Sequence, residues 1–356
     1  MKRKLLVAVP LLCLVVLLAW YFRPKHESLG EAYISERSVT LWSSVAQVRE
    51  QTGVLLYGDR VEVLARRNEN VKVRNVNGLV GWVDGRYLME PELWQRSAKL
   101  LQQVEAIPVQ ARGRTKVPTN LRVEPGRTKP RLYQFSRNTP VEIVGRATAD
   151  WVQVSDEKES EGEPVETKKE DWFLVRATAT RPPGEGVVRN SAITTTTQPG
   201  DQTIPIAGWV VARFVALDLP DPVLEETESA NVRPLAWFEL NRVTDDQGEH
   251  PQYLVAATKG PEGAPCDFTT TRVYTWNPRK SRYETAFIEN NLCGSFPIRV
   301  GKDAKNEPEF RFHTMGDTEE RVYRLIQTVV RRVKEEGATG KHKPEKPKAK
   351  EAPAKK

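Results

Sequence analysis

VKVRNVNGLVGWVDGRYL, residues 71–88, is the stretch that decides the fold. Apolar and polar side chains alternate on both sides of Asn77-Gly78, and this dipeptide favours the turn of a β-hairpin. Upstream, the run VLLYGDRVEVL at residues 54–64 alternates in the same way around turn residues. The first part of the chain therefore predicts short antiparallel strands joined by turns.

A second β-rich stretch repeats the spacing of the first. Gly81 lies six residues before Tyr87, and Gly208 lies six residues before Phe214. Such internal repetition predicts two copies of one structural unit.

The second copy is longer than the first by 47 residues between corresponding positions. Residues 156–169 are rich in Glu, Lys and Ser, and residues 181–202 are rich in Pro, Gly and Thr. Neither run has enough apolar surface to fold alone, so both are predicted to be flexible loop insertions.

These runs resemble the bacterial SH3-like (SH3b) pattern. The pattern has a first strand close to L-x-V-R, found here as AQVRE at 46–50, and a middle strand of alternating Val after a Gly. It ends in Gly-x-x-Gly-Trp-Val with an aromatic residue six positions after the second Gly, as at residues 78–87. The resemblance implies one small β-barrel over 37–90 and a second, more diverged one over 114–218.

The resemblance also implies where a ligand would bind. Trp82 and Trp209 open the last strand of each copy, and Tyr87 and Phe214 lie just after it. Flat aromatic rings suit peptide backbones, sugars and Pro-rich segments, although the same rings also suit the core of a small barrel, and both readings stay open. Further surface candidates near the same grooves are Tyr57, Arg74 and Arg86.

The remaining segments differ in composition. Residues 91–108 predict a helical connector, 219–230 a Pro- and acid-rich linker, 231–335 a C-terminal antiparallel β domain, and 337–356 a disordered Lys/Pro/Ala tail. The last element of the β domain, at about 320–333, fits a helical stripe or a hairpin strand, and its β-branched content favours the strand. The fold class is thus mainly β.

The start of the chain predicts a membrane anchor within residues 1–26. Residues 5–22 form an unbroken apolar run whose 18 residues would make a helix of about 27 Å. Three basic residues precede the run, so the positive-inside rule places the rest of the chain outside the cytoplasmic (inner) membrane. A cleaved signal peptide and a lipid-modified Cys13 are the alternatives, and all three export the body.

Cysteine usage agrees with export. Outside the apolar run there are only Cys266 and Cys293, and an oxidising compartment would join them. A bridge closing 28 residues would stabilise the fold by about 3–4 kcal/mol. The alternatives are a catalytic thiol acting with His250 or His313, or a metal site. The paired Cys-x-x-Cys spacing of a metal site is absent from the sequence.

Charge and motifs bear on the function class. The net charge is +7, but residues 1–25 and 341–356 each contribute +5, which leaves −3 for residues 26–340 and gives no reason to expect nucleic-acid binding. The sequence contains no Gly-x-Ser-x-Gly or His-Glu-x-x-His motif, so we predict no catalytic residues, cofactor or metal.

We therefore predict a non-enzymatic, membrane-anchored, extracytoplasmic binding or scaffold protein of the bacterial envelope. The SH3b resemblance implies peptidoglycan peptides or an envelope protein as the partner. The alternative is a C-terminal domain with its own small-molecule or catalytic role, localised by the barrels. The basic tail would either lie against anionic envelope polymers or lipid head groups, or only add solubility.

Overall fold

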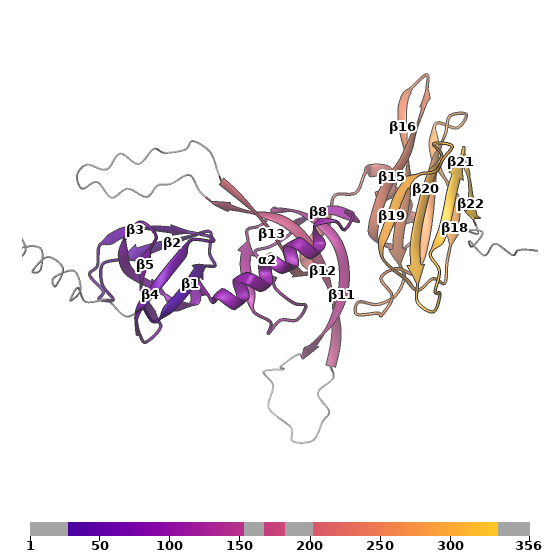
Figure 1. Ribbon diagram of the computed structural model, residues 1–356. Coiled ribbons are helices and arrows are strands. Elements are labelled where there is room, and N and C mark those ends of the chain that lie inside the picture. The colour runs from indigo at the N-terminus through magenta and orange to yellow at the C-terminus, as the bar shows by residue number, and fades with distance from the viewer. Residues whose placement is uncertain (1–27, 153–166, 182–201, 334–356) are drawn as a thin grey trace, which may run out of the picture. The chain divides into compact units, whose positions relative to one another are not determined.

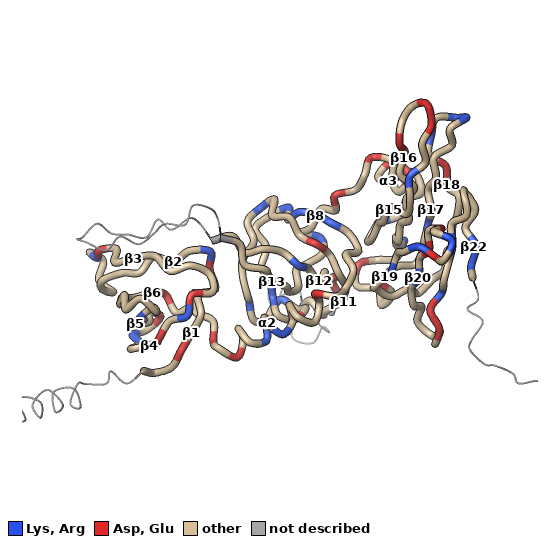
Figure 2. Tube along the Cα trace, turned by 45° about the horizontal axis from the view of Figure 1, so that its top comes forward, with Lys and Arg blue, Asp and Glu red and all other residues tan. Residues whose placement is uncertain are grey.

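The computed structural model describes residues 28–152, 167–181 and 202–333. The chain forms two compact units, shown in Figure 1. The first comprises Met1–Pro220 together with Gly260–Pro265, and the second comprises Asp221–Lys259 and Cys266–Lys356. Both units are built mainly from antiparallel strands, which confirms the mainly β fold class. Basic and acidic residues are interspersed along the strands of both (Figure 2).

The first sheet of unit 1 has seven strands in the order β3-β2-β6-β5-β4-β1-β7. Buried and half-buried side chains alternate along most of its strands, so one face of each strand supplies the core. Leu41, Leu55, Val63 and Val73 are at most 2% exposed. The strands are β1 (Gly30–Ile34), β2 (Ser38–Trp42), β3 (Gln51–Leu56), β4 (Arg60–Arg67), β5 (Asn70–Asn75), β6 (Val80–Asp84) and β7 (Leu88–Met89), and the short helix η1 (Gly85–Tyr87) precedes β7.

The Asn77-Gly78 turn joins β5 to β6 as a hairpin. Gly78 has a φ of +81°, a conformation that glycine adopts at little cost. The Asn75 side-chain oxygen accepts hydrogen bonds from the backbone N–H groups of Asn77 and Leu79, at 3.0 and 2.9 Å. The connection is therefore a four-residue loop rather than a two-residue turn, because Asn75 closes it with its side chain.

The helix α2 (Pro91–Glu105) follows the first sheet. It begins with Pro91 in its first turn, where the missing N–H costs nothing. Trp94 stacks on Tyr33 of β1 with ring centroids 4.7 Å apart. The other end of α2 contributes Val104 to a buried cluster with Val144 and Leu174 of the second sheet.

The second sheet has the same strand order as the first, β10-β9-β13-β12-β11-β8-β14. Each strand of the first sheet has a counterpart, and η2 (Ala212–Phe214) corresponds to η1. The strands are β8 (Ala111–Thr115), β9 (Thr119–Arg122), β10 (Arg131–Phe135), β11 (Pro140–Val152), β12 (Thr167–Arg181), β13 (Gln202–Val211) and β14 (Val215–Leu217).

The two predicted insertions coincide with the long strands of this sheet. β11 pairs with β12 as far as Val152↔Thr167, and β12 pairs with β13 as far as Arg181↔Gln202. Residues 167–169 were predicted as loop but belong to β12, since continued cross-strand pairing satisfies their backbone groups. Residues 156–166 and 182–201 of the predicted insertions lie outside the described residues.

The segment predicted as a linker, 219–230, contains the helix α3 (Asp221–Ser229). Thr227 is buried and donates its hydroxyl to the carbonyl oxygen of Val223 at 2.7 Å. Val223 is fully buried, so this helix is anchored by its apolar side rather than exposed on all sides.

The second unit contains two four-stranded antiparallel sheets, β15-β16-β17-β18 and β19-β20-β21-β22. Phe287 of β18 contacts Tyr323 of β21 with ring centroids 5.7 Å apart, so the sheets pack through aromatic side chains. The strands are β15 (Arg233–Asp245), β16 (Gly248–Thr258), β17 (Thr270–Asn277), β18 (Arg282–Glu289), β19 (Gly294–Lys302), β20 (Pro308–Thr314), β21 (Arg321–Ile326) and β22 (Val329–Val333).

The last element is a hairpin and not a helix. β21 pairs with β22 through Ile326↔Val329, and Gln327 in the turn has a φ of +56°. Ile326 and Val329 are 38% and 51% exposed, whereas a helical stripe would have buried both.

The predicted disulfide between Cys266 and Cys293 is present, with Cα atoms 4.8 Å apart. It connects the segment before β17 to the segment before β19, so it links the two sheets of the second unit. The predicted anchor at 5–22 and the predicted tail at 337–356 lie outside the described residues. Within the described ranges, no helix has the length and apolarity to cross a membrane.

Candidate functional site

A groove of about 470 Å³ lies on the first sheet. Its position depends on the crossing of β2 and β6, where Trp42 and Trp82 are paired across the strands. A Cβ atom at Gly81 would lie 2.5 Å from Leu41 Cγ and 2.8 Å from the carbonyl oxygen of Trp42. Only glycine lets the two strands approach this closely, so Gly81 determines where the backbone of Trp42 lies. The groove is lined by Glu36, Ser38, Val39, Thr40, Trp42, Arg49, Asn70, Asp84 and Tyr87.

The aromatic part of the groove is a Trp–Arg pair. The guanidinium carbon of Arg49 lies 4.4 Å from the centroid of the Trp42 ring. Arg49 is exposed and Trp42 is half-buried, so both present surface to a ligand. A cation over an indole face is a favourable arrangement, and it leaves the guanidinium edge free to bind a carboxylate.

The acidic part of the groove is Asp84. Its carboxylate accepts a hydrogen bond from the backbone N–H of Arg86 at 2.8 Å and an ion-paired hydrogen bond from Arg86 Nη2 at 2.7 Å. The side-chain hydrogen bond from Arg86 lowers the pKa of Asp84, with the backbone bond and the positive charge acting in the same direction. Asp84 is therefore held as a carboxylate in the lining of the groove.

Three of the sequence-predicted residues lie in or beside this groove. Tyr87 lines it and also packs against the core of the first sheet. Trp82 is half-buried on β6 opposite Trp42, outside the lining. Arg86 is exposed and holds Asp84.

Tyr57 lies elsewhere, in a buried aromatic contact between the first sheet, α2 and the second sheet. It is 1% exposed, with ring centroids 5.9 Å from Trp94 and 4.9 Å from Tyr133. Burial raises the pKa of its hydroxyl, with a smaller contribution from Tyr133. Tyr57 is thus a packing residue in this structure and offers no surface to a ligand.

Arg74, on β5, is half-buried and forms an ion pair with Glu62 of β4 at 3.0 Å. It does not belong to the groove lining.

The corresponding place on the second sheet is built differently. Trp209 pairs with Arg122, so an arginine stands where the first sheet has Trp42. Trp209 is half-buried and packs against the buried cluster that contains Val104 of α2. Phe214 is also half-buried, and the guanidinium carbon of Arg213 lies 5.4 Å from the centroid of its ring. Trp209 and Phe214 therefore have different neighbours from Trp82 and Tyr87, their counterparts on the first sheet.

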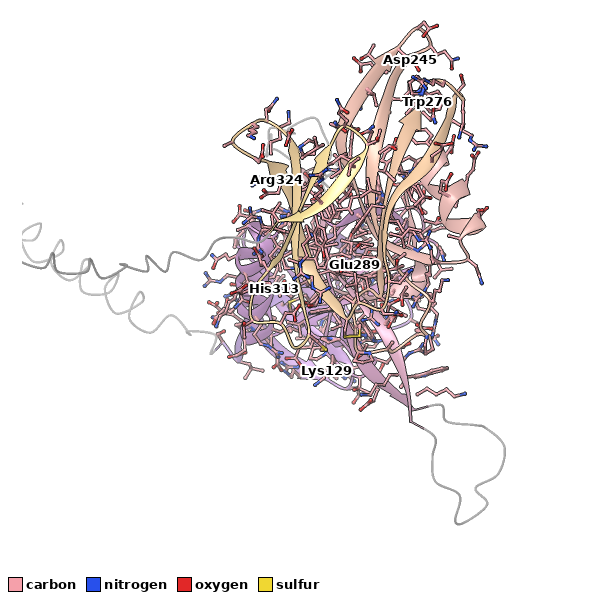
Figure 3. The ribbon with its side chains drawn as sticks, turned by 90° about the vertical axis from the view of Figure 1, so that its right-hand side faces the viewer. Lys129, Asp245, Trp276, Glu289, His313 and Arg324 are labelled. Carbon is pink, nitrogen blue, oxygen red and sulfur yellow. A yellow bond between two sulfur atoms is a disulfide. The ribbon has the colours of Figure 1, made fainter. Side chains whose placement is uncertain are left out.

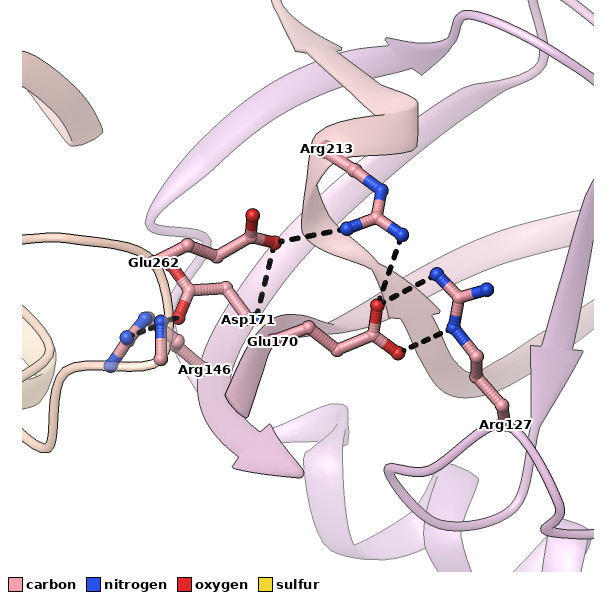
Figure 4. A network of polar contacts seen from close by, with 7 residues as sticks. Arg127, Arg146, Glu170, Asp171, Arg213 and Glu262 are labelled. Atoms are coloured by element: carbon pink, nitrogen blue, oxygen red, sulfur yellow. Dashed lines mark hydrogen bonds and ion pairs between the residues drawn. The ribbon is translucent and has the colours of Figure 1, made fainter. Parts of the chain in front are cut away.

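The second sheet instead carries a network of buried charges (Figure 4). Glu170 is 1% exposed and accepts two hydrogen bonds from Arg127, both at 2.9 Å. It also forms an ion pair with Arg213 at 3.2 Å. Both arginines also lie over the ring of Trp151, at 4.7 and 5.3 Å from its centroid. Each charge has a partner, so removing any one of them would leave another buried and uncompensated.

The segment Gly260–Pro265 completes this network. Asp171 is fully buried, forms an ion pair with Arg146, and accepts a hydrogen bond from the backbone N–H of Gly263 at 2.8 Å. Arg146 also donates to the carbonyl oxygen of Ala264 at 2.8 Å. A Cβ at Gly263, whose φ is +82°, would lie 2.5 Å from the Lys169 backbone oxygen, so this position requires glycine.

In the second unit, aromatic and acidic side chains gather where β15 turns into β16. Figure 3 shows Trp276 of β17 beside Asp245. The indole Nε1–H donates to Asp245 Oδ2 at 2.6 Å, and the ring of His250 stacks on Trp276 at 3.8 Å. His313, the other histidine considered with a cysteine, lies 3.4 Å from Glu320. Both cysteines are held in the disulfide, and among the described residues no group of three or more His, Cys, Asp or Glu side chains is arranged to hold a metal ion.

Trp42 and Arg49 were missed as site residues by the sequence prediction. Trp42 ends the run VTLW and Arg49 lies in AQVRE, with no spacing motif that joins them. The sequence shows Trp42 only as a large aromatic residue at the end of a short predicted strand. That position indicates a site only once β2 is known to cross β6.

Comparison with solved structures finds likenesses at low sequence identity. An NlpC/P60 family protein from Bacillus cereus ATCC 10987 matches at 13% identity and a TM-score of 0.20, over 72% of this chain and 93% of that chain. NlpC2 from Trichomonas vaginalis matches at 8% identity and a TM-score of 0.17, over 86% of this chain and 98% of that chain. NlpC1 from the same organism matches at 8% identity and a TM-score of 0.16, over 72% of this chain and 87% of that chain. TM-scores of this size do not establish a shared fold.

A comparison with curated proteins finds no match. A family model does match part of the chain. Residues 48–89, which include Arg49, Asn70, Asp84 and Tyr87 of the groove, match the bacterial SH3 domain.

Proposed function

We propose that the chain is a non-enzymatic binding protein of the bacterial envelope and that it recognises cell-wall peptides through the groove on the first sheet. The observation that carries this proposal is the Trp42–Arg49 pair, which lines one groove together with Asp84. Arg49 and Asp84 lie within the stretch that matches the bacterial SH3 domain, and Trp42 lies just before it. Bacterial SH3 domains are associated with cell-wall binding, so peptidoglycan is the ligand class that the domain suggests.

The chemistry of the groove suits a short peptide that carries both charges. Arg49 offers a guanidinium to a carboxylate, and Asp84 offers a carboxylate to an amine. Trp42 and Tyr87 supply flat apolar surface, on which a peptide backbone or aliphatic side chain can lie. The hydroxyl and amide groups of Ser38, Thr40 and Asn70 add hydrogen-bonding partners.

The second sheet is, in this proposal, a diverged SH3-like copy that supports the first. Its strand order and its glycine at 208 support this view, because a Cβ there would lie 2.7 Å from the Arg122 carbonyl oxygen and from Leu121 Cγ. Arg122 replaces the tryptophan of the first sheet, so ligand binding is assigned to the first sheet alone. Residues 5–22 are proposed as the anchor that holds the chain at the inner membrane.

The test is sedimentation of the purified full chain with isolated cell-wall sacculi. Arg49→Ala and Trp42→Ala should each weaken binding by at least about tenfold, because central aromatic and arginine contacts dominate binding energies. Arg137→Ala, an exposed arginine in the turn before β11, is the matched control and should bind like the unchanged protein. Melting curves accompany each variant.

Two results would overturn the proposal. One is unchanged sedimentation of Arg49→Ala and Trp42→Ala while both melt normally. The other is equal loss of binding in Arg137→Ala, which would mean that general positive charge, and not the groove, holds the chain on the wall.

A further inference from the structure

A second groove, of about 730 Å³, lies in the second unit between α3 and the β17–β18 hairpin. It does not depend on the first sheet and shares no residue with the groove described above. Its lining residues are Asp221, Pro222, Glu225, Glu226, Trp276, Ser281, Arg282, Tyr283, Glu284 and Thr285.

The aromatic wall of this α3 groove is held in one orientation. Trp276 donates its indole N–H to Asp245, stacks on His250, and meets the ring of Tyr283 edge-on at 5.3 Å. Tyr283 in turn contacts Tyr253 at 5.9 Å. A ring fixed from three sides can receive a ligand without losing further rotational freedom.

The opposite wall is acidic. α3 contributes Asp221, Glu225 and Glu226, and none of these three forms an ion pair with another described residue. Glu284, on the hairpin, is already bound by Lys280 at 2.7 Å and Arg282 at 3.1 Å. Among the acidic residues of this groove, those of α3 are therefore the ones with no ion-paired partner in the described ranges, and they share the groove with rings that also attract cations.

The chain itself carries a segment of matching charge. Residues 341–356 contain seven lysines and two glutamates, a net charge of +5, with prolines at 344, 347 and 353. Pro-rich segments adopt an extended form that suits aromatic-lined grooves at low entropic cost. Lysines spaced along such a segment can reach both the carboxylates and the rings.

Connectivity brings this segment within reach of the α3 groove. The last described strand, β22, ends at Val333 and contacts β18, which carries Tyr283 and Glu284. The 23 residues after Val333 span at most about 80 Å when extended. Tethering also raises the effective concentration of the segment to the millimolar range, so even a weak contact would be populated.

We propose that residues 341–356 bind in the α3 groove of their own chain, with lysine ammonium groups over Trp276 and Tyr283 and beside Asp221, Glu225 and Glu226. The bound segment covers the groove and neutralises α3. An external cationic peptide would have to displace it.

The test uses the full chain and zero-length carbodiimide coupling, which joins a carboxylate to a lysine only in direct contact. We expect products between residues 341–356 and Glu225 or Glu226 at five times or more the yield of products with Glu228. Glu228 is the matched control because it lies on the same helix and is exposed, but does not line the groove. Added 0.5 M NaCl should reduce the Glu225 and Glu226 products several-fold.

A second measurement does not depend on chemical coupling. Replacing Lys343, Lys346, Lys348 and Lys350 with Gln should shift the indole N–H resonance of Trp276, whereas Glu345→Gln with Glu351→Gln should shift it far less. All six positions lie outside the described residues, and melting curves of both variants check that the fold is retained.

Three outcomes would overturn the proposal: equal coupling to Glu228, an unmoved Trp276 resonance in the lysine variant, or coupling found only between chains when labelled and unlabelled protein are mixed. The last outcome would assign the groove to a second copy of the chain.

Discussion

Asp171 shows how much a single side chain contributes to the second sheet. It is fully buried and paired with Arg146, which is 2% exposed. Asp171→Asn should lower the free energy of unfolding by about 3–5 kcal/mol, because removing one partner leaves the other charge buried and uncompensated. Urea unfolding measures the change. Asp150→Asn, exposed on the same β11–β12 ribbon, should change it by about 0.5 kcal/mol or less, and equal effects of the two would contradict this account.

Glu284 gives the β17–β18 hairpin a dependence on pH. Hydrogen bonds from Lys280, Asn277 and Arg282 lower the pKa of its carboxyl from 4.5 to about 2. Because the folded-state pKa is below the unfolded value, Glu284 stabilises the fold above pH 4.5, and this contribution is lost as the pH falls through about 2. The melting temperature of Glu284→Gln should therefore be lower than that of the unchanged protein at pH 6. The difference between the two melting temperatures should shrink toward pH 2. A gap that stays constant over this range would show that the ion pairs are not its cause.

At the residue scale, the sequence predicted some features of the groove and missed others. Tyr87 was predicted and lines it, whereas Trp42 and Arg49 were not singled out. A ring's neighbours depend on which strands cross, and β2 and β6 are far apart in sequence. Tyr57 was predicted as a surface residue near the grooves, but α2 and the second sheet cover it.

The two strand crossings depend on glycine. Gly81→Ala and Gly208→Ala should each destabilise their sheet by about 1–3 kcal/mol, because a Cβ would lie within 3 Å of a backbone oxygen on the crossing strand. Gly145→Ala is the control, since its Cβ would meet Leu174 at an ordinary contact distance of 3.6 Å. Thermal unfolding of the three variants compares them directly. If Gly145→Ala costs as much as Gly208→Ala, the loss reflects general strand effects and not the crossing.

At the element scale, spacing was more informative than composition. The equal intervals from Gly81 to Tyr87 and from Gly208 to Phe214 correspond to equivalent strand–helix junctions, β6–η1 and β13–η2. Composition alone placed residues 167–169 in a loop and 219–230 in an irregular linker. Backbone pairing along β11–β12 and the burial of Val223 on the packed side of α3 are tertiary effects that local composition does not encode.

The disulfide should act on the second unit as a whole. It closes a loop across 27 residues of sequence separation, and its removal by Cys266→Ser with Cys293→Ser should lower the free energy of unfolding by about 3–4 kcal/mol. Calorimetry should show a lower melting temperature for this unit. A reducing agent should lower the melting temperature of the unchanged protein and leave that of the double variant unaffected. Equal sensitivity of both proteins to the reductant would exclude the bridge as the cause.

The six residues Gly260–Pro265 determine how this protein can be divided for experiments. They are encoded between β16 and β17, yet they complete the charge network of the first unit through Gly263 and Ala264. A gene fragment that stops at Pro220 would leave Asp171 without its amide donor, and one that begins at Asp221 would carry a hexapeptide that belongs to the other piece. To keep both units intact, the first fragment should contain this hexapeptide, either fused to it or added as a separate peptide. In the second fragment, a short Gly-Ser linker should join residues 259 and 266.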